Sequence, residues 1–501
     1  MTVQRPRFRR ILGAVTLAVA VLLGMFPTAA GAATAWSTPV SVSVDGLNGA
    51  GEGMQLTVAP NGNVVGTWAH FDGSDYSVQV AVSTDGGSSW GSPATISDPA
   101  GHAEGPKVVI NGSGAILVYW VAAIGNDWQV QISTSTDGGA SWSNYVAISN
   151  TSYSGQAPVV VADGDHGFVA AYQSNDGANV DMITRTSNSD GATWSNFELT
   201  SSGVEDAFTP ALSENGEGTF EIVWFENGPA NFDLVSVSSS DGGLSWTTPV
   251  DVVAGEEIVQ DIRLLPTTGV EHVLLWARDD GASSTIFVQR STSGGTSWNA
   301  PIEVVSGALE NSYFTGAAGS GVMAVAWVDD DGTTSSILFS SSQDSGSTWS
   351  TPQTLATTPT IMSAAYWAIR IVVSSQDSIA VTWSKISGNP SGEGDVIEVV
   401  TTSDGASTWS PIAQPGGLNT SQSNAVPLPS GHFVLSWVLA GDGENAVQTA
   451  TSVTPTLANT GLDAHMKTLL ALLAGTAVVV GLTTKKWGRL RESNSRPIHY
   501  E

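Results

Sequence analysis

The sequence contains no cysteine, and its central part contains very few basic residues. Without cysteine, neither a disulfide framework nor a thiolate metal site can form, so the folded chain has to rely on a large apolar core. Between residues 33 and 460 there are seven lysines and arginines against 43 acids, a formal net charge of −36. A field of this sign repels nucleic acid and anionic lipid surfaces, so we expect no nucleic-acid partner.

Helical periodicity is absent before residue 465, and a repeat takes its place. Seven tryptophans recur at intervals that are mostly 52 residues, and each closes a short motif of the form Ser-x-Asp-x-Gly-x-x-Trp: Trp90, Trp142, Trp194, Trp246, Trp298, Trp349 and Trp409. Three copies depart from this motif. Ser189 and Ser293 replace the aspartate in the third and fifth copies, and the seventh has Thr402, Asp404 and Ala406.

A second aromatic series runs in phase with the first, and each of its members ends an apolar, β-branched run: Trp68, Trp120, Tyr172, Trp224, Trp276, Trp327, Trp383 and Trp437. These rings either form the core between neighbouring repeats, which is the more common use of such a residue, or stack on sugars. The eight members indicate eight repeats.

Each period contains four short β-type segments separated by Gly, Asn and Asp turns. In the second repeat they are Lys107–Ile110, Ala115–Trp120, Gln129–Thr134 and Tyr145–Ser149. Four strands in about 52 residues is typical of a propeller blade. The sequence therefore predicts an all-β fold, a β-propeller of eight four-stranded blades, with seven blades as the alternative.

The two ends of the repeat region predict how the ring closes. The last unit, from Ala425 to Val453, has three predicted strands but no motif and no fourth strand. The segment Trp36–Val44 resembles a fourth strand that has no blade before it, because Trp36-Ser-Thr-Pro39 matches the residues that follow each motif. Pairing the two would complete an eighth blade from both ends of the chain and remove an open edge.

The repeated motif resembles the Asp-box, or BNR repeat, of the sialidase superfamily of propellers, over residues 36–450. The resemblance implies that each motif forms the turn between the third and fourth strands of a blade, on the face away from the functional site. In such a turn Asp and Ser satisfy backbone amides and Gly supplies a positive φ. We therefore expect the motif aspartates to be structural.

Sialidases of this superfamily use three arginines to grip the substrate carboxylate, a Tyr–Glu pair and an Asp acid. Between the predicted signal peptide and tail this chain has only Arg185, Arg263, Arg278, Arg290 and Arg370, and none of them lies in the first blade. Sialidase-like catalysis is therefore disfavoured. An exo-acting glycosidase on an anionic or complex glycan remains the alternative to a non-catalytic binding protein.

Candidate ligand-binding residues come from positions that stand out from the repeat. Lys107, Arg263 and Arg370 fall on predicted innermost strands, where they either face the channel and hold an anionic sugar or pair with local acids. If the protein were an enzyme, the reactive groups would be Tyr366, Glu205 and Glu257. Trp128 and Trp367 break the repeat pattern, which suggests exposed rings that stack on sugars. Acidic loops leave calcium binding open, but the sequence predicts no cofactor and no specific metal site.

The termini predict export and anchoring. Residues 1–32 have the basic start, apolar run and small-residue end of a signal peptide. A propeller at 36–453 is followed by a linker and pentapeptide at 454–461, an apolar helix at 466–484 and a basic tail at 485–501. The pentapeptide is formed by Leu457, Ala458, Asn459, Thr460 and Gly461.

This arrangement resembles a sortase cell-wall sorting signal of the Leu-Ala-x-Thr-Gly type found in some actinobacteria. The resemblance implies that a sortase cleaves between Thr460 and Gly461, and that the helix holds the chain in the membrane before sorting. A plain tail anchor is the alternative. We therefore expect a protein at the cell wall or surface of a Gram-positive bacterium that binds a glycan or another extracellular ligand.

Overall fold

The structure is a computed structural model that describes most of the chain between residues 34 and 453. The described ranges are 34–43, 53–201, 203, 205–215, 218–227, 232–253, 258–265, 267, 271–279, 284–308, 314–330, 334–358, 369–385, 394–440 and 445–453. These ranges contain β-strands and turns and no helix. The predicted signal peptide, sorting pentapeptide, apolar helix and basic tail lie outside them.

No helix long and apolar enough to cross a membrane is found in the ranges given above.

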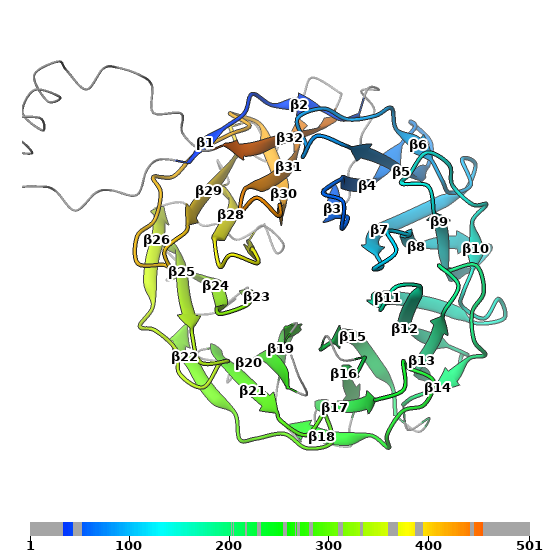
Figure 1. The fold of residues 1–501 in the computed structure, drawn as a ribbon. Helices are drawn as coiled ribbons and strands as arrows, with labels where there is room; N and C mark the ends of the chain where they lie inside the picture. Colours follow the sequence, from blue (N-terminus) through cyan, green and yellow to red (C-terminus); the bar gives the residue numbers. More distant parts are fainter. Residues whose placement is uncertain are drawn as a thin grey trace, which may run out of the picture. The chain divides into compact units, whose positions relative to one another are not determined.

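The strands form eight sheets around a central opening, which confirms the predicted eight-bladed propeller (Figure 1). The innermost strands are β3 (Gln55–Val58), β7 (His102–Ile110), β11 (Ser154–Asp163), β15 (Ala207–Glu214), β19 (Ile258–Leu265), β23 (Phe314–Ala318), β27 (Arg370–Val373) and β30 (Thr420–Pro427). The second strands are β4 (Val64–Phe71), β8 (Ile116–Ile124), β12 (Gly167–Asn175), β16 (Phe220–Asn227), β20 (His272–Asp279), β24 (Met323–Asp330), β28 (Ile379–Lys385) and β31 (Phe433–Ala440).

The third strands are β5 (Tyr76–Ser83), β9 (Asp127–Ser135), β13 (Val180–Ser187), β17 (Phe232–Ser239), β21 (Ser284–Ser291), β25 (Ser335–Ser342), β29 (Val396–Thr402) and β32 (Asn445–Val453). Most of the outermost strands are shorter: β6 (Ala94–Thr95), β10 (Val146–Ala147), β14 (Glu198–Leu199), β18 (Val250–Val253), β22 (Ile302–Ala308), β26 (Gln353–Thr358), β1 (Ala35–Trp36) and β2 (Val40–Ser41). We number the blades in chain order, beginning with the sheet β3–β6.

The eighth blade is completed by both ends of the described chain, as the sequence predicts. Strands β1 and β2 both pair antiparallel with β32, which joins β31 and β30 in the same sheet. The amide of Val447 donates to the Ser43 hydroxyl at 3.0 Å, and the amide of Thr451 donates to the Ser37 hydroxyl at 3.0 Å.

The same hydroxyl acceptors recur in blades made from one continuous segment. In the second blade, Ser149 accepts from the amide of Val130 at 2.9 Å and Ser143 accepts from the amide of Thr134 at 3.0 Å. Residues 37–43 therefore take the place that residues 143–149 hold in the second blade. This repetition explains why the serine pattern near the amino terminus matches the pattern after each motif.

The second aromatic series forms the core between blades. All eight rings have an exposed fraction of 1% or less, which settles the two alternatives in favour of packing. Trp120, for example, lies in one apolar cluster with Val78 of the first blade and Val118 of the second. These rings are therefore not available to stack on a ligand.

The innermost strands bend at a repeated bulge. The register of β7 against β8 shifts between Glu104 and Lys107, and Gly105 has a φ of 59°. One period further on, Ala157 has a φ of 46°, and two periods on, Thr209 has a φ of 51°. The bulge lets β7 begin at His102, five residues before the predicted start at Lys107, so the strand continues through Pro106. Bulges of this kind re-aim the residues on one side of them.

The seventh blade departs from the predicted four strands. Its sheet contains β27, β28 and β29, and the place of a fourth strand is taken by isolated bridges such as Val399 to Ala413. The chain then turns at Pro415-Gly416-Gly417, where a Cβ on Gly416 would lie 2.7 Å from the Trp437 ring. A side chain at this position would clash with the eighth blade, so only glycine fits here.

Candidate functional site

The two ends of each sheet carry different connections. The hairpins between second and third strands and the connections between blades lie at one end, which we call the loop face; in the first two blades it is made of residues 72–75, 96–101, 125–126 and 148–153. The motif turns lie at the opposite end, because Ser135 at the end of β9 pairs with Ile116 at the start of β8. We call that end the Asp-box face.

The Asp-box residues satisfy one another within their own turns. In the first copy, Ser83 Oγ donates to Asp85 Oδ1 at 2.8 Å, and the amide of Gly87 donates to Ser83 Oγ at 2.8 Å. The amide and hydroxyl of Ser89 donate to the two Asp85 carboxylate oxygens at 2.8 and 2.6 Å. In the second copy, the equivalent donors of Ser141 lower the pKa of Asp137 to about 2. The prediction of a structural role is confirmed, since the turns use these oxygens.

The copies without aspartate keep part of this network. The amide of Thr193 donates to Ser189 Oγ at 3.0 Å, and the amide of Ser297 donates to Ser293 Oγ at 2.9 Å. In the third copy the neighbouring Asp190 takes a different role and accepts from the Asn111 side chain at 2.8 Å. That contact joins two blades on the Asp-box face.

A row of aromatic rings crosses the loop face from the first blade to the second. We call Phe71, Tyr76, His102 and Trp128 the aromatic track. The ring centroids of Tyr76 and His102 are 5.5 Å apart at an interplanar angle of 88°, and those of His102 and Trp128 are 5.8 Å apart at 69°. Unlike the buried second series, Tyr76, His102 and Trp128 are partly exposed. The track therefore offers rings held by two rigid sheets.

The repeat explains where the track lies. Tyr76 and Trp128 are 52 residues apart and open the third strands β5 and β9. His102 opens the innermost strand β7 and lies above the bulge at Gly105. The sequence singled out Trp128 alone; its spacing to Tyr76, equal to one period, is the signal that would have added the second ring.

Two carboxylates hold the imidazole of His102. Its Nδ1 hydrogen-bonds Asp75 Oδ1 on the first blade, and its Nε2 lies 2.6 Å from Glu104 Oε1. Burial disfavours the charged ring, but the hydrogen bonds with Glu104 and Asp75 outweigh it and raise the pKa of His102 above its usual value. The side chains of Asp75 and Glu104 remain 37% and 50% exposed, so both are within reach of a ligand.

The position of His102 recurs in the next two blades as a link between sheets. One period on, Ser154 Oγ accepts from the amide of Trp128 at 3.2 Å. Two periods on, Asp206 Oδ1 accepts from the amide of Val180 at 2.8 Å. Each residue thus holds the start of the third strand in the preceding blade. The first and second blades differ because their link is a ring that is itself part of the surface.

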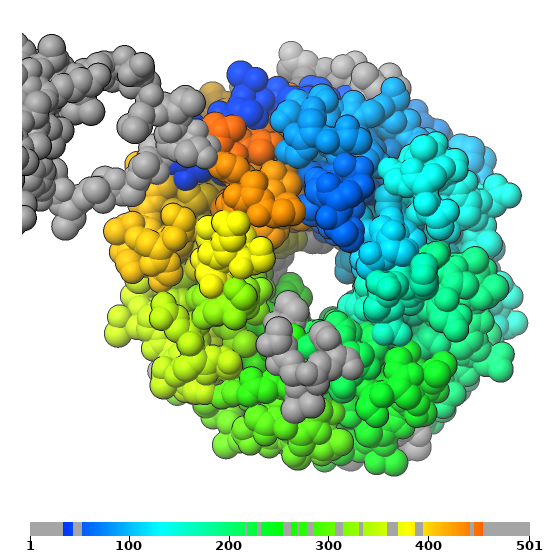
Figure 2. All heavy atoms as spheres, in the orientation of Figure 1, coloured from blue at the N-terminus to red at the C-terminus, as the bar shows by residue number. Residues whose placement is uncertain are grey.

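The basic residues predicted to face the channel lie at one register on three different blades. Lys107 pairs with Tyr119, Arg263 with Leu275 and Arg370 with Thr382. Arg263 and Arg370 each donate to the carbonyl of the preceding residue, at 3.3 and 3.1 Å. All three residues make further interactions within the protein. Their strands belong to the second, fifth and seventh blades and border the central opening seen in Figure 2.

The remaining predicted site residues fall into two groups. Glu205 is half-buried in the connection between β14 and β15, directly before Asp206. The others lie outside the described residues: Tyr366, Glu257, Trp367, Leu457, Ala458, Thr460 and Gly461. In the described ranges no group of three His, Asp or Glu side chains is placed to hold a metal ion.

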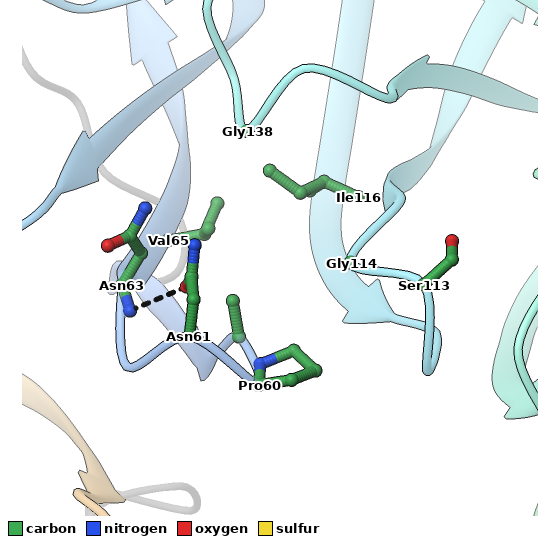
Figure 3. Close-up of a pocket in the computed structure, with 9 residues that line it drawn as sticks. Pro60, Asn61, Asn63, Val65, Ser113, Gly114, Ile116 and Gly138 are labelled. Carbon is green, nitrogen blue, oxygen red and sulfur yellow. Dashed lines mark hydrogen bonds between the residues drawn. The ribbon is translucent and has the colours of Figure 1, made fainter.

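Two cavities lie on the Asp-box face and not beside the track. One of about 110 Å³ is formed between the first two blades and is lined by residues such as Asn61, Asn63 and Ser113 (Figure 3). A more open one of about 450 Å³ lies between the eighth and first blades, near Asp85 and Pro429. The smaller cavity has no charged lining residue and neither cavity adjoins the aromatic track, so we place the candidate site on the loop face.

Fold and turns together define the chain as an eight-bladed propeller built from Asp-box repeats. Residues 70–257 match the family model of the BNR repeat-like domain. Comparison with curated proteins gives no match.

Among solved structures, an α-L-arabinanase of Penicillium chrysogenum complexed with arabinobiose is similar at 13% identity and a TM-score of 0.40, covering 83% of this chain and 98% of its own. An α-L-arabinofuranosidase of Fusarium graminearum is similar at 10% identity and a TM-score of 0.40, covering 83% and 97%. The NanB sialidase of Streptococcus pneumoniae is similar at 13% identity and a TM-score of 0.34, covering 82% and 70%.

Proposed function

We propose that this propeller binds glycans on the cell surface through the aromatic track and does not catalyse a reaction. The observation that carries the proposal is the contrast between two sets of rings. Eight rings of the repeat are buried between blades, whereas Tyr76, His102 and Trp128 are partly exposed in one row on the loop face. Apolar C–H faces of sugar rings pack on aromatic faces, and nearby carboxylates accept sugar hydroxyl protons.

The test is a glycan array followed by calorimetry on the purified protein and its Trp128→Ala variant. Losing the ring should weaken binding of the best array ligand about tenfold. Phe232→Ala is the matched control, because Phe232 is 44% exposed and opens β17 two periods after Trp128, outside the track. If both variants lose affinity to the same extent, or if neither loses affinity, the track is not the binding site.

The alternative function is a glycosidase acting on an anionic or complex glycan. The shared register of Arg263 and Arg370 favours it, since both are long basic side chains on innermost strands. A chromogenic-glycoside screen separates the two functions. Turnover that is lost in Arg263→Ala or Arg370→Ala would overturn the non-catalytic proposal.

Export and sortase anchoring at Thr460 belong to the same proposal, on the strength of the terminal segments. Replacing residues 457–461 should move the protein out of the muramidase-released wall fraction. If the protein stays in the wall fraction, the sorting proposal fails and the glycan-binding proposal is untouched.

A further inference from the structure

The surroundings of the aromatic track carry almost no positive charge. The three segments that form it, residues 70–76, 98–104 and 123–128, contain five acids and no lysine or arginine: Asp72, Asp75, Asp98, Glu104 and Asp127. Lys107 is the only lysine or arginine between residues 53 and 150. The first two blades therefore present a negative field at the site.

Two of these acids contact a ring of the track, and two others stand next to a track residue in the chain. Asp75 and Glu104 both contact the imidazole of His102. Asp127 is exposed and directly precedes Trp128. Asp72 accepts from the amides of Ser74 and Asp75 at 2.8 and 3.0 Å, and these bonds lower its pKa to about 2. Even with His102 protonated, the carboxylates outnumber the cations at the track.

We propose that the aromatic track selects saccharides that carry free amino groups, in preference to neutral and anionic ones. This inference rests on the glycan-binding function proposed above and names its ligand class. An amino group attached directly to a stacked sugar ring lies at the ring edge, within reach of Glu104 and Asp75. Opposite charges a few ångströms apart in water attract by about 1 kcal/mol, and aromatic faces add a cation–π term.

A sugar fits the site better than a lysine-rich peptide. The rings of Tyr76 and Trp128 are held on β5 and β9, so they are fixed before binding. A pyranose presents its apolar face and its ammonium group as one rigid unit. A lysine side chain has several rotatable bonds and loses conformational entropy when they are ordered on binding. This loss lowers its affinity for the same contacts.

Calorimetry with three hexamers of equal length tests the inference on the full protein. The probes are a glucosamine hexamer, an N-acetylglucosamine hexamer and a galacturonic acid hexamer, at about pH 6 so that the amines are charged. We expect the glucosamine hexamer to bind about four- to tenfold more tightly than its acetylated counterpart. The galacturonic acid hexamer should bind least. Added salt should reduce the preference, because the acids are exposed.

Two charge-removing variants connect the preference to the track. Glu104→Gln and Asp72→Asn keep the size of the side chain and one of its oxygens but remove a charge, so each should weaken binding of the glucosamine hexamer more than binding of the acetylated hexamer. Trp128→Ala should weaken both. Glu198→Gln is the matched control, because Glu198 is an exposed acid on the outer strand β14.

The outcomes separate the two proposals. If all hexamers bind equally, or if the preference survives Glu104→Gln, the charge selectivity is wrong while glycan binding stands. If no saccharide binds, both fail together. A lysine-rich peptide that binds more tightly than any hexamer, and that competes for Trp128, would also overturn the inference.

Discussion

At the scale of single residues, Glu221 is an ionisable side chain in the interior of the protein. It is fully buried on β16, at the position that Val169 occupies one period earlier. Both its carboxylate oxygens lack a hydrogen-bond partner among the described residues. They lie against Gly295 of the fifth Asp-box, where an added Cβ would be 1.6 Å from Oε2. Burial raises the pKa of Glu221 well above its usual value.

The burial of Glu221 predicts that the free energy of unfolding depends on pH. Because the folded-state pKa is raised, the neutral carboxyl supports the fold below the unfolded-state pKa near 4.5, and that support is lost as pH rises towards the folded-state pKa. Glu221→Val should therefore stabilise the protein at pH 7 by about 1–3 kcal/mol. The gain should shrink towards pH 4. Thermal melts across this range measure it.

Thermal melts of two further variants serve as controls for this prediction. Glu221→Gln removes the titration but keeps the size of the side chain, so its melting temperature should follow a flatter pH profile than the wild type. Val169→Ile changes the equivalent apolar position and should show no difference in pH dependence. Parallel profiles for wild type and Glu221→Gln would contradict the prediction.

At the scale of single elements, the Asp-box turns differ in the strength of their hydrogen bonds. Asp241 accepts from the hydroxyl and the amide of Ser245 and from the hydroxyl of Ser239. In the fifth copy, Ser293 Oγ lies 3.4 Å from Ser291 Oγ, which is a weaker contact. A carboxylate at this position would replace it with charge-assisted bonds.

Ser293→Asp should therefore raise the free energy of unfolding by about 1 kcal/mol, and Asp241→Ser should lower it. The contribution of the motif aspartate should depend on pH in the direction opposite to the contribution of the Glu221 carboxyl itself. The pKa values of the motif aspartates are lowered, to about 2 for Asp344, so their contribution is present above the unfolded-state pKa near 3.8 and is lost as pH falls towards 2. Denaturant unfolding at pH 7 and pH 3 checks both signs. A gain that does not change between these two pH values would exclude the carboxylate as its cause.

Elements also show which features the sequence can and cannot predict. The repeat of about 52 residues predicted four strands per blade, because the apolar pattern, the turn residues and the motif all recur with it. It missed the start of β7 because Gly105 and Pro106 indicate a turn, whereas the structure has a bulge there. Of the track, only Trp128 was predicted. The contact between Asp75 and His102 joins two blades, and sequence spacing alone does not show which hairpin meets which strand.

At the scale of the whole molecule, the ring depends on residues 34–43. Removing the hydroxyls of Ser37 and Ser43 takes two acceptors from the amides of β32. The double alanine variant should lose about 2 kcal/mol of unfolding free energy. Deleting residues 34–43 should expose the whole edge of β32 and cause association of chains. Melting temperature and size-exclusion chromatography measure the two effects.

Ser92→Ala, a change at an exposed serine of the first blade, is the control and should leave both measurements unchanged. If the deletion variant stays monomeric with an unchanged melting temperature, β1 and β2 do not close the ring.

The eighth blade contains strands from both ends of the described chain, and these strands are synthesised at different times. Strand β32 ends at Val453, whereas its partners β1 and β2 are made among the first described residues. Seven blades can form while the chain is still growing, but the first and last strands cannot meet until the ribosome has passed Val453. A chain that ends before β32 therefore cannot complete the eighth blade, however many of its other blades are present.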